Sequence, residues 1–235
     1  MTQRDIIGLI ASYIYAFGLL GAAELIRVRR GYSQAFTRKL VHVGAGMWVW
    51  AIMALFDTWQ VGLIPFGTFI VLNYVFYRLT MFRAMDAEGS TPGTVYFAVS
   101  ITLLYALFWR TDGQTDRAFV ATGGVMAMTW GDALASVVGS RWGRRGYTIW
   151  GHRRTWEGSL TMFLASLVAV GLTLLIIPGS ALSPDSEPLR GSTAALATFL
   201  AAAVATLAEA VAPAGTDNLS VPLFTAATLY IVTTM

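Results

Sequence analysis

The most constraining feature of the sequence is a succession of apolar runs, each about as long as a membrane is thick. The runs cover residues 6–28, 39–56, 59–80, 94–110, 117–140, 158–178, 192–212 and 218–234. A helix of about 20 apolar residues crosses the hydrocarbon core of a bilayer. Only 12% of the residues are charged, about half the share that a water-exposed surface normally requires. We predict an all-α fold, a polytopic integral membrane helical bundle that forms a single domain over residues 1–235.

The number of spans is seven or eight, because the last run is short and contains Pro222. The loops after the first, third and fifth runs hold twelve of the 16 Lys and Arg residues: Arg27, Arg29, Arg30, Arg38, Lys39, Arg78, Arg83, Arg141, Arg144, Arg145, Arg153 and Arg154. The other side holds Arg4, Arg110, Arg117 and Arg190. Because positive loops stay inside, the first side is predicted to be cytoplasmic. With eight spans, both termini then lie on the opposite side.

Ionisable groups within the runs gather toward the predicted cytoplasmic ends. They are Glu24, His42, Asp132 and Glu209, with Asp217 and Asn218 at the start of the last run. Such groups are expensive inside a bilayer and usually serve a function. The acids at the other end are expected to be solvated loop charges: Asp57, Asp112, Asp116, Asp185 and Glu187. Polar groups on one face favour a site at that face over a transport pathway, which more often has its polar groups near the midplane.

Asp132, Ser136 and Gly139 recur at a spacing that places a carboxylate, a hydroxyl and a glycine on one helical stripe. The carboxylate could hold Mg²⁺; the stripe could equally be a helix contact with a buried Asp paired to an Arg. The following loop, 141–157, carries five arginines, His152, three glycines and the single acid Glu157. This composition suits a polyphosphate cradle, and it also suits a positive-inside anchor.

Two further clusters accompany this stripe. Arg38 and His42 are four residues apart and share a helix face beside Lys39, where they could meet a phosphate or serve structure alone. Near the C-terminus, Glu209, Asp217 and Asn218 flank a Pro-containing helix break. With Asp132 these acids could form a Mg²⁺–nucleotide site, or the break could be a proline kink with ordinary caps. The sole lysine, Lys39, is not in a P-loop sequence, and the chain has no cysteine.

Taken together, these motifs resemble the polyprenol kinase family. The motifs are Gly131-Asp132-x-x-Ala135-x-x-x-Gly139-x-Arg141-x-Gly143, Arg154-Thr155-x-Glu157-Gly158-Ser159, Glu209…Asp217-Asn218-x-x-x-Pro222, Arg38-Lys39-x-x-His42, and Glu88 with Gly93-Thr-Val-Tyr96-Phe. The family includes phytol kinase, dolichol kinase and CTP-dependent diacylglycerol kinase, and it is distantly similar to phosphatidate cytidylyltransferase. The short chain is most similar to the phytol kinase branch. Arg154-Thr155 departs from the usual Lys-Ser pair, and Arg and Lys are not interchangeable at a phosphate.

The resemblance implies Mg²⁺-assisted transfer of the γ-phosphate of CTP, or another NTP, to a prenyl alcohol such as phytol or geranylgeraniol at the cytoplasmic face. It implies metal binding by Asp132, Glu209 and Asp217. Nucleotide contacts would come from Arg38, Ser136, Arg141, Arg153, Arg154, Thr155 and Asn218. Lys39 and His42 would sit near the transferred group, and Asp132, Glu157 and His42 are candidates for accepting the alcohol proton. The expected partners are the bilayer, the alcohol and the nucleotide, with no nucleic acid. The alternatives are a CDP-lipid synthase and a non-enzymatic transporter or scaffold.

Overall fold

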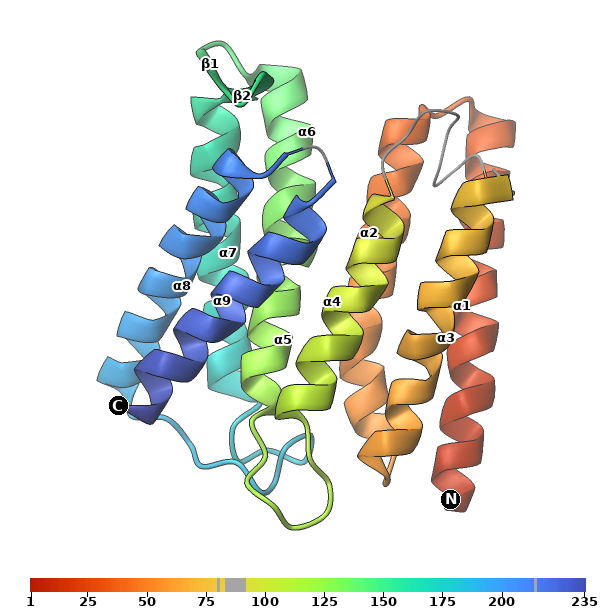
Figure 1. Cartoon of the computed structure of the whole chain (residues 1–235), viewed down its shortest axis with the longest axis vertical. Coiled ribbons are helices and arrows are strands. Elements are labelled where there is room, and N and C mark those ends of the chain that lie inside the picture. The colour runs from red at the N-terminus through yellow and green to blue at the C-terminus, as the bar shows by residue number, and fades with distance from the viewer. Residues whose placement is uncertain (80, 83–91, 214) are drawn as a thin grey trace.

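The chain folds into an all-α bundle whose helices follow the predicted apolar runs (Figure 1). The computed structural model describes residues 1–79, 81–82, 92–213 and 215–235, so Arg83 and Glu88 lie outside the described residues. The helices are α1 Gln3–Arg30, α2 Gln34–Leu55, α3 Trp59–Leu79, α4 Gly93–Phe108, α5 Ala118–Met126, α6 Ala133–Trp142, α7 Trp156–Ile176, α8 Gly191–Val211 and α9 Asp217–Thr234. A π-helical segment, η1 Ala127–Asp132, joins α5 to α6. A hairpin of β1 Gly146–Ile149 and β2 His152–Thr155 precedes α7.

The predicted membrane-type bundle is confirmed. By length and composition, α1, α3, α7 and α8 are each apolar and long enough to cross a bilayer, and α4 is a shorter apolar helix. Pro222 lies inside α9, and the helix continues through it to Thr234. Within the described residues, each of the eight predicted runs therefore contains a helix. Figure 1 shows both termini toward one end of the bundle and the hairpin at the other, as an even number of crossings requires.

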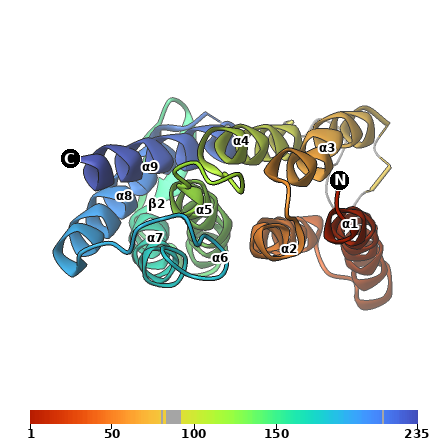
Figure 2. The ribbon, with the colours of Figure 1, turned by 90° about the horizontal axis from the view of Figure 1, so that it is seen from below.

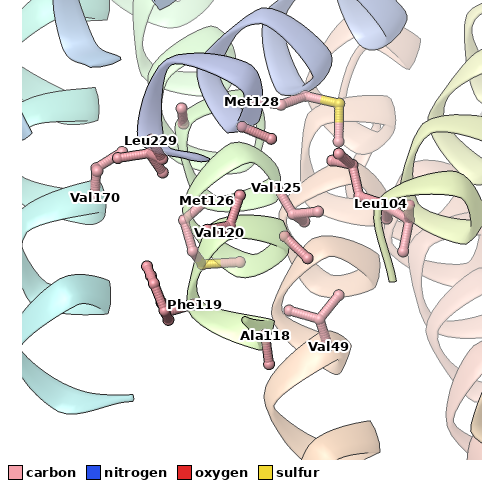
Figure 3. Packing of buried hydrophobic residues seen from close by; sticks show 14 of the residues in the cluster. Val49, Leu104, Ala118, Phe119, Val120, Val125, Met126, Met128, Val170 and Leu229 are labelled. Atoms are coloured by element: carbon pink, nitrogen blue, oxygen red, sulfur yellow. The ribbon is translucent and has the colours of Figure 1, made fainter. Parts of the chain in front are cut away.

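The centre of the bundle is α5, whose nine residues are all buried (Figure 3). Its packing depends on Gly123 and Gly124. A Cβ atom on Gly123 would lie 2.4 Å from a methyl carbon of Leu229, and one on Gly124 would lie 2.5 Å from the carbonyl oxygen of Pro222. Helices in a bilayer associate through such close backbone approaches, because lipid is as apolar as the side chains and no hydrophobic effect drives the helices together. The small residues of α5 therefore fix its contact with α9.

At the end opposite the hairpin, Asp116 is buried, so the expectation that it is a solvated loop charge is wrong. One carboxylate oxygen accepts hydrogen bonds from the backbone N–H groups of Arg110 (2.9 Å) and Ala118 (3.0 Å), and the Ser183 hydroxyl donates to the other. Burial raises the pKa of the Asp116 carboxyl. Asp116 thereby ties the start of α5 to the loop before α8. Asp57 is partly exposed and pairs with Arg4 at 3.0 Å.

Candidate functional site

Most of the predicted site residues line one cavity of about 860 Å³ at the hairpin end of the bundle. They are Arg38, Lys39, His42, Asp132, Ser136, Arg153, Arg154, Thr155, Glu209, Asp217 and Asn218. These residues come from α2, η1, α6, the hairpin, α8 and α9, and they form three clusters that are far apart in sequence. The fold thus brings three separate sequence clusters into a single polar chamber.

Asp132 lines the chamber and contacts two side chains of α2. The Lys39 ammonium donates to its carboxylate at 2.6 Å, and His42 Nε2 lies 3.9 Å from the same oxygen. His42 Nε2 also lies 3.1 Å from the carbonyl oxygen of Met128. Because a carbonyl only accepts, this contact places a proton on Nε2, and in the neutral ring Nδ1 is then the acceptor nitrogen. A lysine, a carboxylate and an imidazole therefore meet at one point.

The π-helical segment positions Asp132 for this meeting. A π-helix is rare and is frequently found at functional sites, because the extra residue per turn redirects a side chain and changes the backbone bonding. Close packing on both sides supports it: a Cβ on Gly131 would lie 2.4 Å from Ser166 Oγ, and one on Gly46 of α2 would lie 2.0 Å from Thr129 Oγ1. These glycines allow α7 and α2 to approach η1 closely enough for Lys39 to reach Asp132.

A second ion pair lies across the chamber. Arg154 Nε of β2 is 2.8 Å from Glu209 Oε1 of α8, and Arg154 also donates to the carbonyl oxygen of Ala212 at 3.4 Å. Both side chains line the cavity. The guanidinium is therefore oriented by the end of α8 and has further N–H donors for an anion, since five donors are available to an arginine.

Asp217 and Asn218 begin α9 at the edge of the same chamber. Asp217 Oδ1 accepts the backbone N–H of Asn218 at 2.9 Å. Asn218 Oδ1 is buried and has no hydrogen-bond partner within the described part of the chain. A buried acceptor without a partner normally calls for an explanation such as a bound ion or ligand. This atom indicates that the chamber is built to contact something more than protein.

The donor set fits a magnesium ion that is shared with phosphates. Within the described residues, no three His, Asp or Glu side chains stand close enough to form a metal cage by themselves. Magnesium usually keeps several waters and binds one or two carboxylates plus substrate phosphates. Asp132, Glu209, Asp217 and Asn218 all line the chamber, and the buried carbonyl oxygen of Asn218 has no partner within the described residues.

Two predicted residues, Arg141 and Glu157, are absent from the described cavity lining. Arg141 lies over the ring of Trp142, 5.2 Å from its centre. The Glu157 carboxylate accepts the backbone N–H of Arg145 at 3.3 and 3.4 Å and so anchors the hairpin to α7. Thr155 lines the cavity and also caps α7 by accepting the N–H of Gly158 at 3.1 Å. The arginine-rich loop is therefore partly a chamber wall and partly a fold element.

Sequence reasoning placed the alcohol tail between apolar helices but did not identify the residues that line the apolar half of the cavity. Ser12 and Tyr15 of α1 and Trp48 of α2 line it far from the charged end. One signal was present in the sequence: Trp48 lies near the middle of an apolar run, whereas tryptophan in membrane helices prefers the interfaces. The Glu24 carboxylate, by contrast, is ion-paired with Arg27 on α1 and lies outside the cavity lining.

No model of a known protein family matches the chain, and no solved structure matches it. Among characterised proteins, it is 36% identical to a phytol kinase of Synechocystis sp. over 92% of this chain and 87% of that protein. The chain belongs to the polyprenol kinase family. Within the family it lies in the phytol kinase branch: it is also 25% identical to a probable chloroplastic phytol kinase 1 of Oryza sativa subsp. japonica over 92% of this chain and 70% of that protein. A dolichol kinase of Mus musculus is 29% identical over 54% of this chain and 27% of that protein. The resemblance drawn from the motifs is thereby confirmed.

Proposed function

We propose that this lipid kinase transfers the γ-phosphoryl group of CTP, or another NTP, to the hydroxyl of a prenyl alcohol at the cytoplasmic face of the membrane. The observation that carries the proposal is the composite cavity. Its polar chamber holds Asp132 between Lys39 and His42, and it continues into an apolar arm between α1, α2, α3 and α4. A prenyl alcohol matches this arrangement, because its hydroxyl would lie in the charged chamber and its hydrocarbon tail in the apolar arm.

In the proposed reaction, the alcohol oxygen forms a bond to the γ-phosphorus while the bond from that phosphorus to the β–γ bridging oxygen breaks. The nucleoside diphosphate leaves with the bridging oxygen, and the hydroxyl proton passes to a protein base. Asp132 and His42 Nδ1 are the candidate acceptors that line the chamber. Catalysis of this reaction consists mainly of positioning and of neutralising the phosphate charge.

The cationic groups of the chamber have distinct proposed roles. Lys39 would contact the transferred phosphoryl group, because it is held beside Asp132 at the boundary between the polar chamber and the arm. Arg154 would bind the nucleotide phosphates in the orientation set by Glu209, with Arg38, Arg153, Ser136, Thr155 and Asn218 as further contacts. Arg141 and Glu157 are assigned a smaller share, since Arg141 lies over Trp142, Glu157 binds the backbone of Arg145, and neither is in the described cavity lining.

Asp132, Glu209 and Asp217 would hold Mg²⁺, and the cation would supply positive charge that neutralises the nucleotide phosphates. Lys39 pairs with Asp132 and Arg154 pairs with Glu209, so two of the three carboxylates already face a cation. The chamber is thus balanced for a ligand that brings both a cation and phosphate groups.

The decisive experiment supplies purified protein in detergent with Mg²⁺, a mixture of prenols and diacylglycerol, and CTP labelled at either the γ- or the α-phosphate. Label that enters an alcohol from the γ position only is the expected result, and the labelled species identifies the acceptor. Label from the α position once phosphatidate is added would assign a CDP-lipid synthase instead. No transfer from CTP, ATP, GTP or UTP would overturn the proposal in favour of a non-enzymatic protein.

A matched pair of variants tests the site. Asp132→Asn should abolish transfer, because it removes the carboxylate that Lys39 and His42 face. Asp57→Asn makes the same chemical change at the opposite end of the bundle, in an exposed pair with Arg4, and should retain activity. Equal loss in both variants, or full activity in Asp132→Asn, would refute the assignment of Asp132.

A further inference from the structure

The apolar arm of the cavity lies within a ring of packed helices. α1 packs against α2 and α3, α3 packs against α4, α4 packs against α5, and α2 returns to α5 and η1. Figure 2, which looks along the bundle, shows these helices arranged around a centre. Apolar side chains such as Leu20, Phe66, Phe69 and Ile101 line the interior. A hydrocarbon chain that enters this space therefore lies between the lining faces of α1, α2, α3 and α4.

The arm ends at a floor within the bundle. The lining residues farthest from the charged chamber are Ser12 on α1, Trp48 on α2, Pro65 on α3 and Ile101 on α4. Trp48 follows Lys39 by nine positions, which corresponds to about 14 Å of helix rise. Beyond this level the bundle is filled: the ring of buried Phe56 lies against Gly8, and the ring of buried Trp109 lies against Gly62.

Trp48 is fixed in place at that floor by two contacts, each with a residue that is itself hydrogen-bonded to the backbone. Its indole N–H donates to Ser12 Oγ at 3.1 Å, and Ser12 in turn donates to the carbonyl oxygen of Gly8 at 2.7 Å. The Tyr15 ring stacks on the indole with 4.0 Å between ring centres, and its hydroxyl donates to the carbonyl oxygen of Gly44 at 2.8 Å. Because the polar atoms of this cluster satisfy one another, the surface that remains for a ligand is rigid and apolar.

We propose that Trp48, held by Ser12 and Tyr15, is the stop that limits the length of the alcohol tail. The inference rests on the proposed kinase function, and it adds to it a residue that determines specificity. The hydroxyl is held at Asp132 and Lys39, so the distance from there to the indole sets how much chain fits without bending. Saturated and unsaturated tails of the same length meet the same floor.

The expected dependence on chain length is a step rather than a slope. Lipid is as apolar as the arm, so an added methylene that fits gains little when it moves from lipid into the protein. A tail that is too long must instead displace well-packed side chains or fold back, an overpacking that corresponds to a loss of about 5- to 150-fold in kcat/KM. The step should occur where the tail end reaches Trp48.

The test measures kcat/KM of the full-length protein for prenols of increasing isoprene number and for their saturated counterparts. Trp48→Ala should move the step to longer alcohols and improve kcat/KM at least fivefold for the first length that the wild type rejects. Ala45→Leu, one helical turn nearer to His42, should move the step to shorter alcohols. If Trp48→Ala fails to fold, Ala45→Leu decides the test by itself.

Trp50→Ala is the matched control. Trp50 lies on the same helix, but its indole faces Met126, with the ring nitrogen 3.3 Å from the sulfur, and it is outside the described cavity lining. In the Trp50→Ala variant, kcat/KM should drop at the same alcohol length as in the wild type. An active Trp48→Ala or Ala45→Leu variant with an unmoved step would overturn the length stop while leaving the kinase function intact. A wild type that phosphorylates no alcohol would overturn both.

Discussion

Replacement of Gly46 by alanine should damage both the fold and the site, because of one close approach. A Cβ atom at Gly46 would lie 2.0 Å from Thr129 Oγ1, 2.7 Å from its Cγ2 and 2.9 Å from its Cβ. All three separations are shorter than van der Waals contact, and both residues are buried, so α2 must move away from η1. Overpacking of this kind typically costs about 1–3 kcal/mol. In a chain of this size, that loss lowers the melting temperature by about 2–12 °C.

The displacement should also reduce activity. Lys39 and His42 lie on α2, one to two turns from Gly46, and Asp132 lies on η1, so a shift between these elements lengthens the 2.6 Å contact of Lys39 with Asp132. We expect kcat to fall at least tenfold. The assay combines thermal unfolding in detergent with the γ-labelled transfer reaction.

Two controls make the reasoning refutable. Gly67→Ala on α3 meets open space at the new methyl group and should stabilise the helix by up to about 1 kcal/mol. Thr129→Ala removes the two nearest of the three clashing atoms, so the double variant Gly46→Ala/Thr129→Ala should recover part of the stability and of the activity. If Gly46→Ala melts and turns over like the wild type, the close contact of α2 with η1 is refuted.

Three further predictions concern individual side chains. Arg154→Ala should raise the KM for the nucleotide at least tenfold and Arg154→Lys less, since lysine keeps the charge but not the planar fork; equal KM values in both variants would contradict a phosphate contact. Asn218→Ala should lower activity yet leave the stability of the ligand-free protein within about 0.5 kcal/mol, because the buried carbonyl oxygen has no partner to lose in the described chain; a large loss of melting temperature would indicate a structural role instead. Burial raises the pKa of the Asp116 carboxyl above its ordinary value of 3.8. The folded state therefore binds this proton more tightly than the unfolded chain does. The stability of the wild type should fall as pH rises from below 3.8 through the pKa of the folded state. Melting temperatures of Asp116→Asn should lack that fall, and a parallel pH dependence in the two proteins would contradict the assignment.

The positions of the helices could be predicted from sequence because apolar length is a local property. Polar and turn residues in the sequence mark where the runs end, for example near Leu55, and where they begin, for example near Trp59 and Gly191. The gathering of Asp132, Glu209 and Asp217 at one end was also predictable, since helix direction alternates along the chain and fixes which ends meet.

Other features depend on contacts that no local pattern specifies. The π-helical turn at Ala127–Asp132 arises where Gly46 and Gly131 allow neighbouring helices to approach, and these contacts link residues far apart in sequence. Glu157 is the single acid of an arginine-rich loop and so resembles an active-site residue in the sequence, but its carboxylate accepts the backbone N–H of Arg145 beside the hairpin. The sequence around Asp116 predicts an exposed loop charge, but in the structure the loop before α8 covers this residue and Ser183 donates a hydrogen bond to its carboxylate.

The position of α9 has a consequence for the time course of synthesis. The helix supplies Leu229 and Pro222 against the two glycines of α5, and it carries Asp217 and Asn218 into the chamber. Since α9 follows the other described helices along the chain, both the central packing and the acidic edge of the chamber are completed only after those helices have been synthesised. A nascent chain that has inserted every earlier helix still lacks part of the chamber, so activity should begin only once α9 has packed against α5.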